Sequence, residues 1–107
     1  MANPADASTP SRILEGTFYF DPEDAIYKDH FPGYPTVPGS LIVHAFLETA
    51  ASQRWIKGAC RIEGFRFARF VPPGKTHFRI ELREGGTVLD CTLHAQGLRS
   101  VTGRLLS

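Results

Sequence analysis

The chain has little cysteine, no excess of charge of one sign and no long hydrophobic run, and each shortage excludes a class of protein. Its two cysteines, Cys60 and Cys91, are not in a metal-binding spacing. The chain has 12 lysines and arginines and 11 aspartates and glutamates, so its net charge is +1. A protein that binds nucleic acid through its phosphates usually has a clear excess of basic residues, which this chain lacks. The hydrophobic share of 42% is too high for a disordered chain. The length of 107 residues then favours one globular domain.

No segment is typical of a membrane span or of an export signal. The most hydrophobic run, residues 41–47, contains His44 and is followed by Glu48, whereas a bilayer span needs about 20 mostly apolar residues. Residues 1–12 have neither the basic start nor the apolar stretch of a signal peptide. We therefore expect a cytoplasmic location with no membrane association. Two reduced cysteines are expected there, with one disulfide as the alternative.

The pattern along the chain predicts a short tail and one mixed domain. Residues 1–11 are small, polar and proline-containing and predict a flexible tail, which leaves residues 12–107 as the domain. The domain begins with a strand at 13–20, a loop rich in proline and glycine at 21–39 and a helix at 40–57. Strands are predicted at 61–71, 77–83, 87–96 and 100–106. We expect an antiparallel sheet curled around the helix, which leaves one side of the helix and the sheet edges open to a partner.

His30 is the first candidate for chemistry. It lies in the segment HFPGYPTVPG (residues 30–39), where three prolines restrict the backbone. A rigid loop can hold a general base in place, and histidine serves as one near neutral pH. The alternative is an ordinary loop histidine that bonds a neighbouring carbonyl.

The start of the predicted helix is the second candidate. Val37-Pro38-Gly39 leads into it, and the first N–H groups of a helix have no partner within the helix. Gly39 lets a ligand approach these groups, which can stabilise an oxygen that becomes negative during a reaction. Plain capping by Ser40 is the alternative.

His44 and Glu48 form the third candidate, because residues four apart share one face of a helix. They can act as an acid/base pair facing a pocket. A metal site of His30, His44 and Glu48 is a second interpretation, and a surface hydrogen bond is the third.

The segment at 30–39 resembles the His-Phe-Pro-Gly-x-Pro-x-x-Pro-Gly motif of the β-hydroxyacyl-[acyl-carrier-protein] dehydratases of fatty-acid synthesis. The apolar start of the helix at 41–43 and the segment ARFVPPG at 68–74 are also similar to that family. The resemblance covers roughly residues 12–107. It implies the α+β hot-dog fold, in which an antiparallel sheet wraps around one long central helix.

The same resemblance implies a reaction and its partners. The family removes water from (3R)-hydroxyacyl thioesters on the phosphopantetheine arm of an acyl carrier protein and forms trans-2-enoyl thioesters. The resemblance implies no metal and no organic cofactor. It also implies a homodimer, or a larger assembly of dimers, with two active sites at the interface.

The roles transfer to single residues of this chain. His30 matches the histidine that takes the C2 proton, and Gly39 matches the glycine whose N–H polarises the thioester carbonyl. Phe31, Val37 and Pro38 are the further residues expected to contact substrate.

The third role, proton donation to the departing hydroxyl, has no direct match. The family has Glu or Asp, contributed by the other subunit, where this chain has His44, and Glu48 stands where many relatives have Gln. Three outcomes stay open: His44 is the acid, Glu48 supplies the carboxyl or tunes His44, or the site has kept thioester binding and lost dehydration.

A local run of basic residues predicts where an acidic carrier protein docks. The run contains Arg66, Arg69 and Lys75, and Arg69 is the position best matched to the family. A solvated sheet face is the commoner meaning of such a run. The leading hypothesis is a dehydratase. The alternatives are a non-catalytic module that binds acyl carrier protein or acyl thioesters, and a thioesterase.

Overall fold

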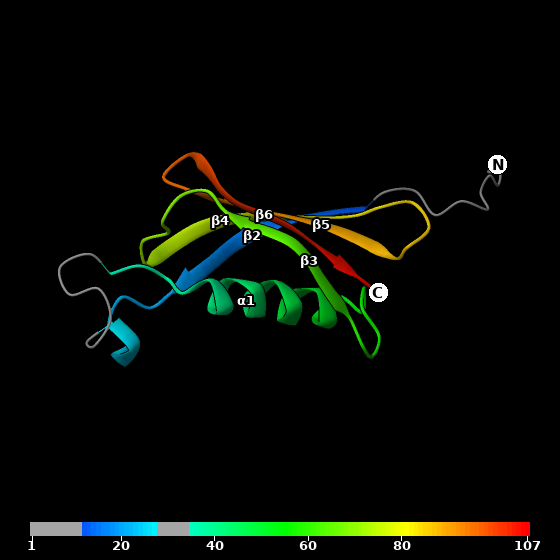
Figure 1. The fold of residues 1–107 in the computed structure, drawn as a ribbon, viewed down its shortest axis with the longest axis horizontal. Coiled ribbons are helices and arrows are strands. Elements are labelled where there is room, and N and C mark those ends of the chain that lie inside the picture. Colours follow the sequence, from blue (N-terminus) through cyan, green and yellow to red (C-terminus); the bar gives the residue numbers. More distant parts are fainter. Residues whose placement is uncertain (1–11, 28–34) are drawn as a thin grey trace.

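The computed structural model of the chain describes residues 12–27 and 35–107. One helix lies against one face of an antiparallel sheet (Figure 1). The helix is α1 (Gly39–Ser52), and a short 3-10 turn, η1 (Ala25–Tyr27), precedes it. The strands are β2 (Arg12–Phe20), β3 (Arg61–Phe67), β4 (Gly74–Leu82), β5 (Val88–Ala95) and β6 (Leu98–Leu106). The predicted combination of one helix and an antiparallel sheet is confirmed.

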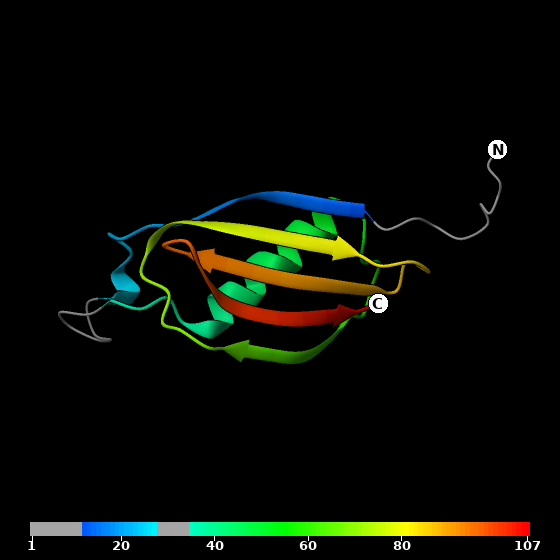
Figure 2. The same cartoon turned by 90° about the horizontal axis from the view of Figure 1, so that it is seen from above.

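The order of strands across the sheet is β2-β4-β5-β6-β3, with every neighbouring pair antiparallel. Figure 2 shows β2 and β3 at the two edges, with α1 crossing the sheet obliquely behind them. The strand that follows the helix in the chain, β3, therefore pairs with the last strand and not with the next one. The sheet edge at β3 pairs with no other strand of the described residues.

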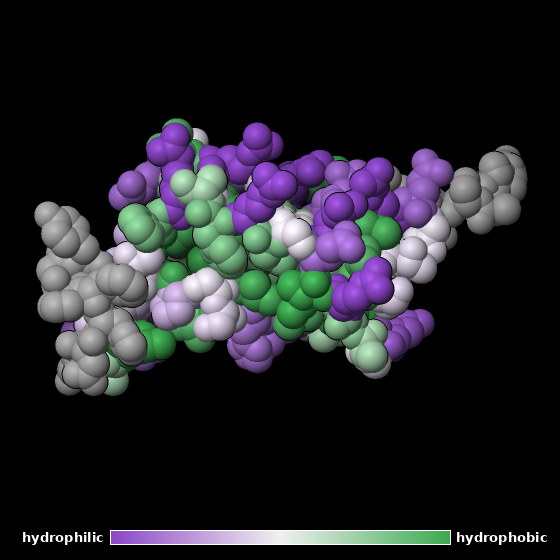
Figure 3. Space-filling model, viewed as in Figure 1, coloured by the Kyte–Doolittle hydropathy of each residue, from purple (hydrophilic) through white to green (hydrophobic). Residues whose placement is uncertain are grey.

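The core lies between the sheet and α1. Alternation along β5 turns Leu89, Cys91, Leu93 and Ala95 inward, and all four are buried as predicted. From the helix, Ile42, Phe46 and Ala50 face the sheet at intervals of four residues and are at most 1% exposed. Figure 3 shows hydrophobic side chains gathered at the level between sheet and helix and hydrophilic ones above the sheet.

Aromatic rings fill the centre of this core. The ring of Phe46 meets that of Phe18 edge-on at 5.1 Å and that of Phe78 at 6.4 Å, and Phe18 stacks on Phe78 at 4.2 Å. Phe65 of β3 tilts toward Phe46 at 6.1 Å. Such pairs add to the free energy gained by burying large apolar rings. The side chains of these rings therefore fill the space between α1 and the centre of the sheet.

The predicted end of the helix at residue 57 is wrong. The helix stops at Ser52, because the N–H of Trp55 bonds to the carbonyl of Ala50 and that of Arg54 to the carbonyl of Ala51. These two bonds form a Schellman motif, which needs a left-handed residue after the helix. Arg54 takes that conformation with a φ of 60°, although glycine is the usual residue there and the next glycine is Gly58.

The strand predicted at 61–71 is also too long. It ends at Phe67 because the N–H groups of Ala68 and Arg69 both bond to the carbonyl of Ser100, which takes the chain out of the regular ladder. The other predicted strands differ from the observed ones by at most three residues at either end. The last hairpin turns at Gln96-Gly97, where both residues have positive φ, as a two-residue turn of this kind requires.

Both cysteines are free thiols, as expected, with Cys91 buried and Cys60 partly exposed. Within the described residues, no helix has the length and hydropathy needed to cross a bilayer. The predicted tail, residues 1–11, lies outside the described residues.

Candidate functional site

The start of α1 presents backbone N–H groups with no partner within the described residues. Pro38 is the N-cap, with φ −58° and ψ 141°, and its carbonyl accepts bonds from the N–H groups of Leu41 and Ile42. The N–H groups of Gly39 and Ser40 lie before these bonds and have no partner in that part of the chain. The alternative of capping by Ser40 is wrong, because Ser40 lies inside the helix and no side chain of residues 12–27 and 35–107 caps its N-terminus. Unpartnered N–H groups at the start of a helix carry positive character and can bind an electronegative atom.

A backbone hydrogen bond fixes the loop before the helix. The N–H of Val37 donates to the carbonyl of Val71 over 2.8 Å, and both residues are at most 3% exposed. This bond ties the segment that carries Val37, Pro38 and Gly39 to the segment that follows β3. The helix start is therefore held from two sides.

Gly39 packs closely against the ring of Phe67. A Cβ atom placed on Gly39 would lie 2.8 Å from Cζ of Phe67, closer than real Cβ contacts allow. The ring of Phe67 stacks loosely on Phe65, with centroids 6.4 Å apart, and 47% of Phe67 is exposed. Phe67 is therefore an aromatic wall beside the first turn of α1.

A pocket of about 340 Å³ lies at this point. One wall is the helix start, from Thr36 to Gly39 with Ile42, and the other is the segment from Phe67 to Val71. Phe70 lies in that second wall and is 83% exposed, so it stands at the opening of the pocket. The size is at the lower end of the range of about 300–1,000 Å³ for small-molecule sites. The pocket can hold an apolar group next to the N–H of Gly39.

Three of the four residues predicted to bind substrate line this pocket, namely Val37, Pro38 and Gly39. His30 and Phe31 lie outside the described residues, so their predicted roles stay predictions. Phe70 is a further lining residue that the sequence motifs do not single out. The available signal is a large aromatic residue between Arg69 and Val71, in the segment that leads to Pro72-Pro73-Gly74.

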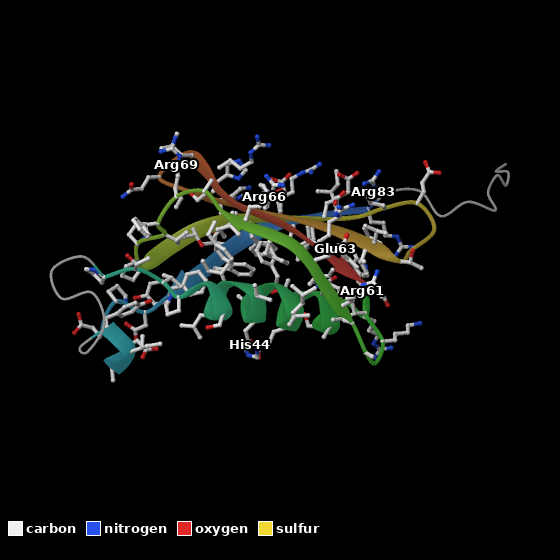
Figure 4. All side chains as sticks on the ribbon, viewed as in Figure 1. His44, Arg61, Glu63, Arg66, Arg69 and Arg83 are labelled. Carbon is white, nitrogen blue, oxygen red and sulfur yellow. The ribbon has the colours of Figure 1, made fainter. Side chains whose placement is uncertain are left out.

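His44 and Glu48 do not line the pocket. They lie one turn apart on the side of α1 that faces away from the sheet, where Figure 4 shows His44 projecting into solvent. Nε2 of His44 and Oε1 of Glu48 are 3.4 Å apart, and the two side chains are 64% and 70% exposed. Within one chain, the structure separates this pair from Gly39.

The proposed metal set cannot be assembled from the described residues. No group of three or more His, Cys, Asp and Glu side chains suited to a metal occurs in residues 12–27 and 35–107. The set of His30, His44 and Glu48 includes one residue outside these ranges.

The residues predicted to dock a carrier protein divide into two places. Arg69 lines the pocket, and Figure 4 shows Arg66 and Arg69 on the upper side of the sheet. Lys75 belongs to β4, and strands β5 and β6 lie between β4 and β3. The partner of Lys75 in register is Tyr19 of β2. Arg66 and Arg69 therefore lie together at one end of the predicted docking surface for the carrier protein. Lys75 lies in a separate part of it.

Two curated proteins match part of the chain. The chain is 35% identical over 75 residues to the 3-hydroxyacyl-[acyl-carrier-protein] dehydratase FabZ of Bacillus subtilis, a match covering 61% of the chain and 53% of that protein. It is 35% identical over 68 residues to the same-named enzyme of Roseiflexus castenholzii, covering 56% of the chain and 47% of that protein. The matches thus span about half the length of each of these relatives.

Solved structures share the fold at low sequence identity. The dehydratase heterocomplex ApeI:P from Xenorhabdus doucetiae aligns with a TM-score of 0.69 at 19% identity, covering 92% of this chain and 94% of that one. An (R)-hydratase from A. caviae involved in PHA biosynthesis aligns with a TM-score of 0.65 at 15% identity, covering 91% and 93%. The predicted hot-dog fold is confirmed.

A family model assigns most of the sequence. The ApeI-like model, described as ApeI dehydratase, matches residues 6–99, which include the helix start, the pocket and four of the five strands in full. The chain therefore belongs to the ApeI-like family of hot-dog dehydratases.

Proposed function

We propose that the chain dehydrates (3R)-hydroxyacyl thioesters, carried by an acyl carrier protein, to trans-2-enoyl thioesters in fatty-acid or related acyl-chain synthesis. The observation that carries this proposal is the pocket at the start of α1, where the N–H of Gly39 has no partner within the described residues. A thioester carbonyl bound there receives a hydrogen bond that strengthens as its oxygen becomes negative. The names of the FabZ relatives support the same reaction.

The proposed reaction divides among three groups. His30 takes the proton from C2, and the electron pair of that C–H bond becomes the new C2–C3 double bond. The C3–O bond breaks, and the hydroxyl leaves as water after receiving a proton from His44 or from Glu48. The N–H of Gly39 stabilises the charge on the carbonyl oxygen between these events.

The proton donor must come from a second subunit in this scheme. His44 faces away from the sheet and does not line the pocket of its own chain. The β3 edge has no strand partner within the described residues, carries half-exposed Ile62 and Phe67, and borders the pocket through Phe67. We propose a homodimer that joins at this edge, because a partner there lies beside the pocket. If the chain instead pairs with a protein of different sequence, as in the ApeI:P heterocomplex, a heterodimer replaces the proposed homodimer.

The direct test is the interconversion of 3-hydroxyacyl and 2-enoyl thioesters, followed by the absorbance of the enoyl product. Wild-type protein is expected to reach equilibrium from either side, and the His30→Ala variant is expected to lose this activity. Carrier-protein binding without turnover would establish a binding module instead, and release of free thiol would establish a thioesterase.

Mixed dimers test where the two histidines come from. A His30→Ala chain and a His44→Ala chain, co-expressed with different tags, give a heterodimer in which one site has both histidines if each site draws on two subunits. Half of the wild-type activity is then expected, although each parent homodimer is inactive. Inactive heterodimers would show that both histidines act from the same chain.

The His30 and His44 scheme also predicts a pH dependence. One imidazole must be neutral to accept a proton while the other is protonated to donate one, so the rate is expected to follow a bell-shaped profile. A flat profile across neutral pH would contradict the scheme.

Arg66, Arg69 and Lys75 are the proposed contacts for the acidic carrier protein. All three are exposed, and reversing the charge of Arg69 is expected to weaken carrier binding in a salt-dependent way.

The cytoplasmic location stays a prediction that cell fractionation can test.

A second candidate function is a non-catalytic module that binds acyl thioesters. The observation that favours it is His44 at the position where the resemblance implies a carboxyl, since His44 does not line the pocket that includes Gly39. The interconversion assay separates the two candidates.

A further inference from the structure

Two groups of arginines on the outer side of the sheet differ in their partners. One group is paired with acids: Arg61 and Arg104 with Glu63, Arg79 with Glu81, and Arg83 with Asp90, at 3.3 to 4.0 Å. The other group is Arg66, Arg69 and Arg99, which take part in none of the ion pairs among residues 12–27 and 35–107. Positive charge that no ion pair offsets attracts an anion.

Arg66 and Arg99 border a common hollow. It measures about 300 Å³, is open to solvent, and is lined by Arg66, Ala68 and the segment from Arg99 to Thr102. Of the described residues, none that line it is acidic. Arg66 comes from β3 and Arg99 from the start of β6, so two elements deliver a cation to one place. A guanidinium group offers several N–H donors in a plane that fits phosphate oxygens.

The backbone around the hollow is held in place. The carbonyl of Ser100 accepts hydrogen bonds from the N–H groups of Ala68 at 2.9 Å and Arg69 at 3.3 Å, and Ser100 is 1% exposed. Its hydroxyl bonds to the carbonyl of Leu98 at 2.9 Å. The segment after β3 and the start of β6 are therefore tied together, which lowers the cost of ordering the site on binding.

The hollow is a neighbour of the pocket at the start of α1. Ala68 lines both, and Arg69 lines the pocket. A ligand with an apolar thioester at one end and a phosphate at the other could occupy both places by crossing the segment 67–69. The sequence alone does not suggest Arg99 as part of this surface, because 30 residues separate it from Arg69.

We propose that Arg66 and Arg99 form an anion subsite for the phosphate of the arm that carries the acyl thioester. The identity of the ligand rests on the proposed function, whereas the anion subsite itself does not. The shared chemistry is a phosphate ester on pantetheine, which either a carrier protein or coenzyme A supplies.

The first experiment measures binding without catalysis or a carrier protein. Titration of the full chain with 4′-phosphopantetheine and with pantetheine, followed by calorimetry, isolates the phosphate. The phosphate-bearing probe is expected to bind at least about tenfold more tightly, and Arg66→Gln and Arg99→Gln are each expected to remove most of this difference, since hydrogen bonds to charged groups are among the stronger ones. Equal affinity for the two probes would overturn the proposal.

Arg83→Gln is the matched control, because it removes the same charge from the same side of the sheet at an arginine paired with Asp90. It is expected to leave the affinity for 4′-phosphopantetheine within about twofold of wild type. If it weakens binding as much as Arg99→Gln does, the effect is one of general charge and the subsite is refuted. Amide chemical shifts provide a readout of location: Ala68, Ser100, Val101 and Thr102 are expected to shift with 4′-phosphopantetheine, and shifts elsewhere alone would overturn the assignment.

The second experiment compares enoyl thioesters of pantetheine, coenzyme A and carrier protein as hydration substrates. The Arg99→Gln variant is expected to raise KM several-fold for substrates that contain phosphate and to leave the pantetheine thioester unaffected. A larger rise in KM for the carrier-protein substrate identifies the carrier protein as the source of the phosphate. A larger rise in KM for the coenzyme A substrate identifies coenzyme A as that source. If binding depends on phosphate but no thioester is hydrated, the proposed function is refuted and the anion subsite stands. If thioesters are hydrated but neither binding nor KM depends on phosphate, the anion subsite is refuted and the proposed function stands.

Discussion

The two faces of helix α1 differ in exposure, and we expect them to differ in role. The face toward the sheet presents Ile42, Phe46 and Ala50, all at most 1% exposed. The opposite face presents His44 and Glu48, whose side chains are more than 60% exposed. Neighbouring residues of one helix thus lie in the core and in solvent, because 3.6 residues make a turn. We expect substitutions on the first face to lower stability and those on the second to lower activity.

The largest effect on stability is expected from Phe46→Ala. The ring is fully buried and meets those of Phe18 and Phe78, so its removal leaves a cavity and lowers the free energy of unfolding by about 3–5 kcal/mol. Urea denaturation measures the change, and His44→Ala in the same helix is the control. A loss no larger than that of His44→Ala would erase the difference between the two faces.

The largest effect on activity with little effect on stability is expected from His44→Ala. If His44 donates the proton to the leaving hydroxyl, its loss reduces kcat by about a hundredfold or more, while unfolding changes by no more than about 0.5 kcal/mol. The conservative test is His44→Glu, which introduces the carboxyl typical of the family and is expected to keep the activity. Full activity in His44→Ala would transfer the role of the acid to another residue.

The two cysteines also differ in burial, with Cys91 buried in β5 and Cys60 partly exposed before β3, and pH is the variable that tests this difference. Burial, followed by the charges of Asp90 and Cys60, raises the pKa of the Cys91 thiol from 9.0 to about 12. The folded chain holds this proton more tightly than the unfolded chain, so the stabilising contribution is complete below pH 9 and is lost as the pH rises toward 12.

Unfolding free energies at about pH 8 and about pH 10.5 measure this loss. The decline is expected to be smaller in Cys91→Ala than in wild type, and Cys60→Ala is expected to keep most of it. The same decline in all three proteins would show that Cys91 does not cause it. At neutral pH, iodoacetamide is expected to label the partly exposed Cys60 before Cys91.

The smallest effect is expected from Glu48→Gln. The contact between His44 and Glu48 is 3.4 Å long and exposed to solvent, so screening reduces it to a few tenths of a kcal/mol, about 0.3–0.5 at most. Thermal unfolding at low and high salt measures it, and Glu84→Gln on an exposed turn is a matched control. A loss above about 1 kcal/mol would indicate that the outer face of α1 contributes to folding after all.

Much of the local structure follows from the sequence. Alternation of apolar residues identifies β5 and its buried side chains, and the absence of proline and glycine after Gly39 identifies α1. The end of α1 does not follow, because Arg54 takes a left-handed conformation that is more common for glycine. The end of β3 is also missed, since it depends on two bonds to the carbonyl of Ser100, more than 30 residues away.

The sequence by itself determines the α+β composition, the Pro38-Gly39 start of the helix and the motif that relates the chain to hot-dog dehydratases. Only the tertiary structure decides that β3 pairs with β6 at the sheet edge and that Phe67 covers Gly39. It also decides that Arg66 and Arg99 border one hollow. The physical reason is that local patterns reflect the periods of helix and strand, whereas strand order, close packing and charge clusters depend on contacts between residues far apart in the chain.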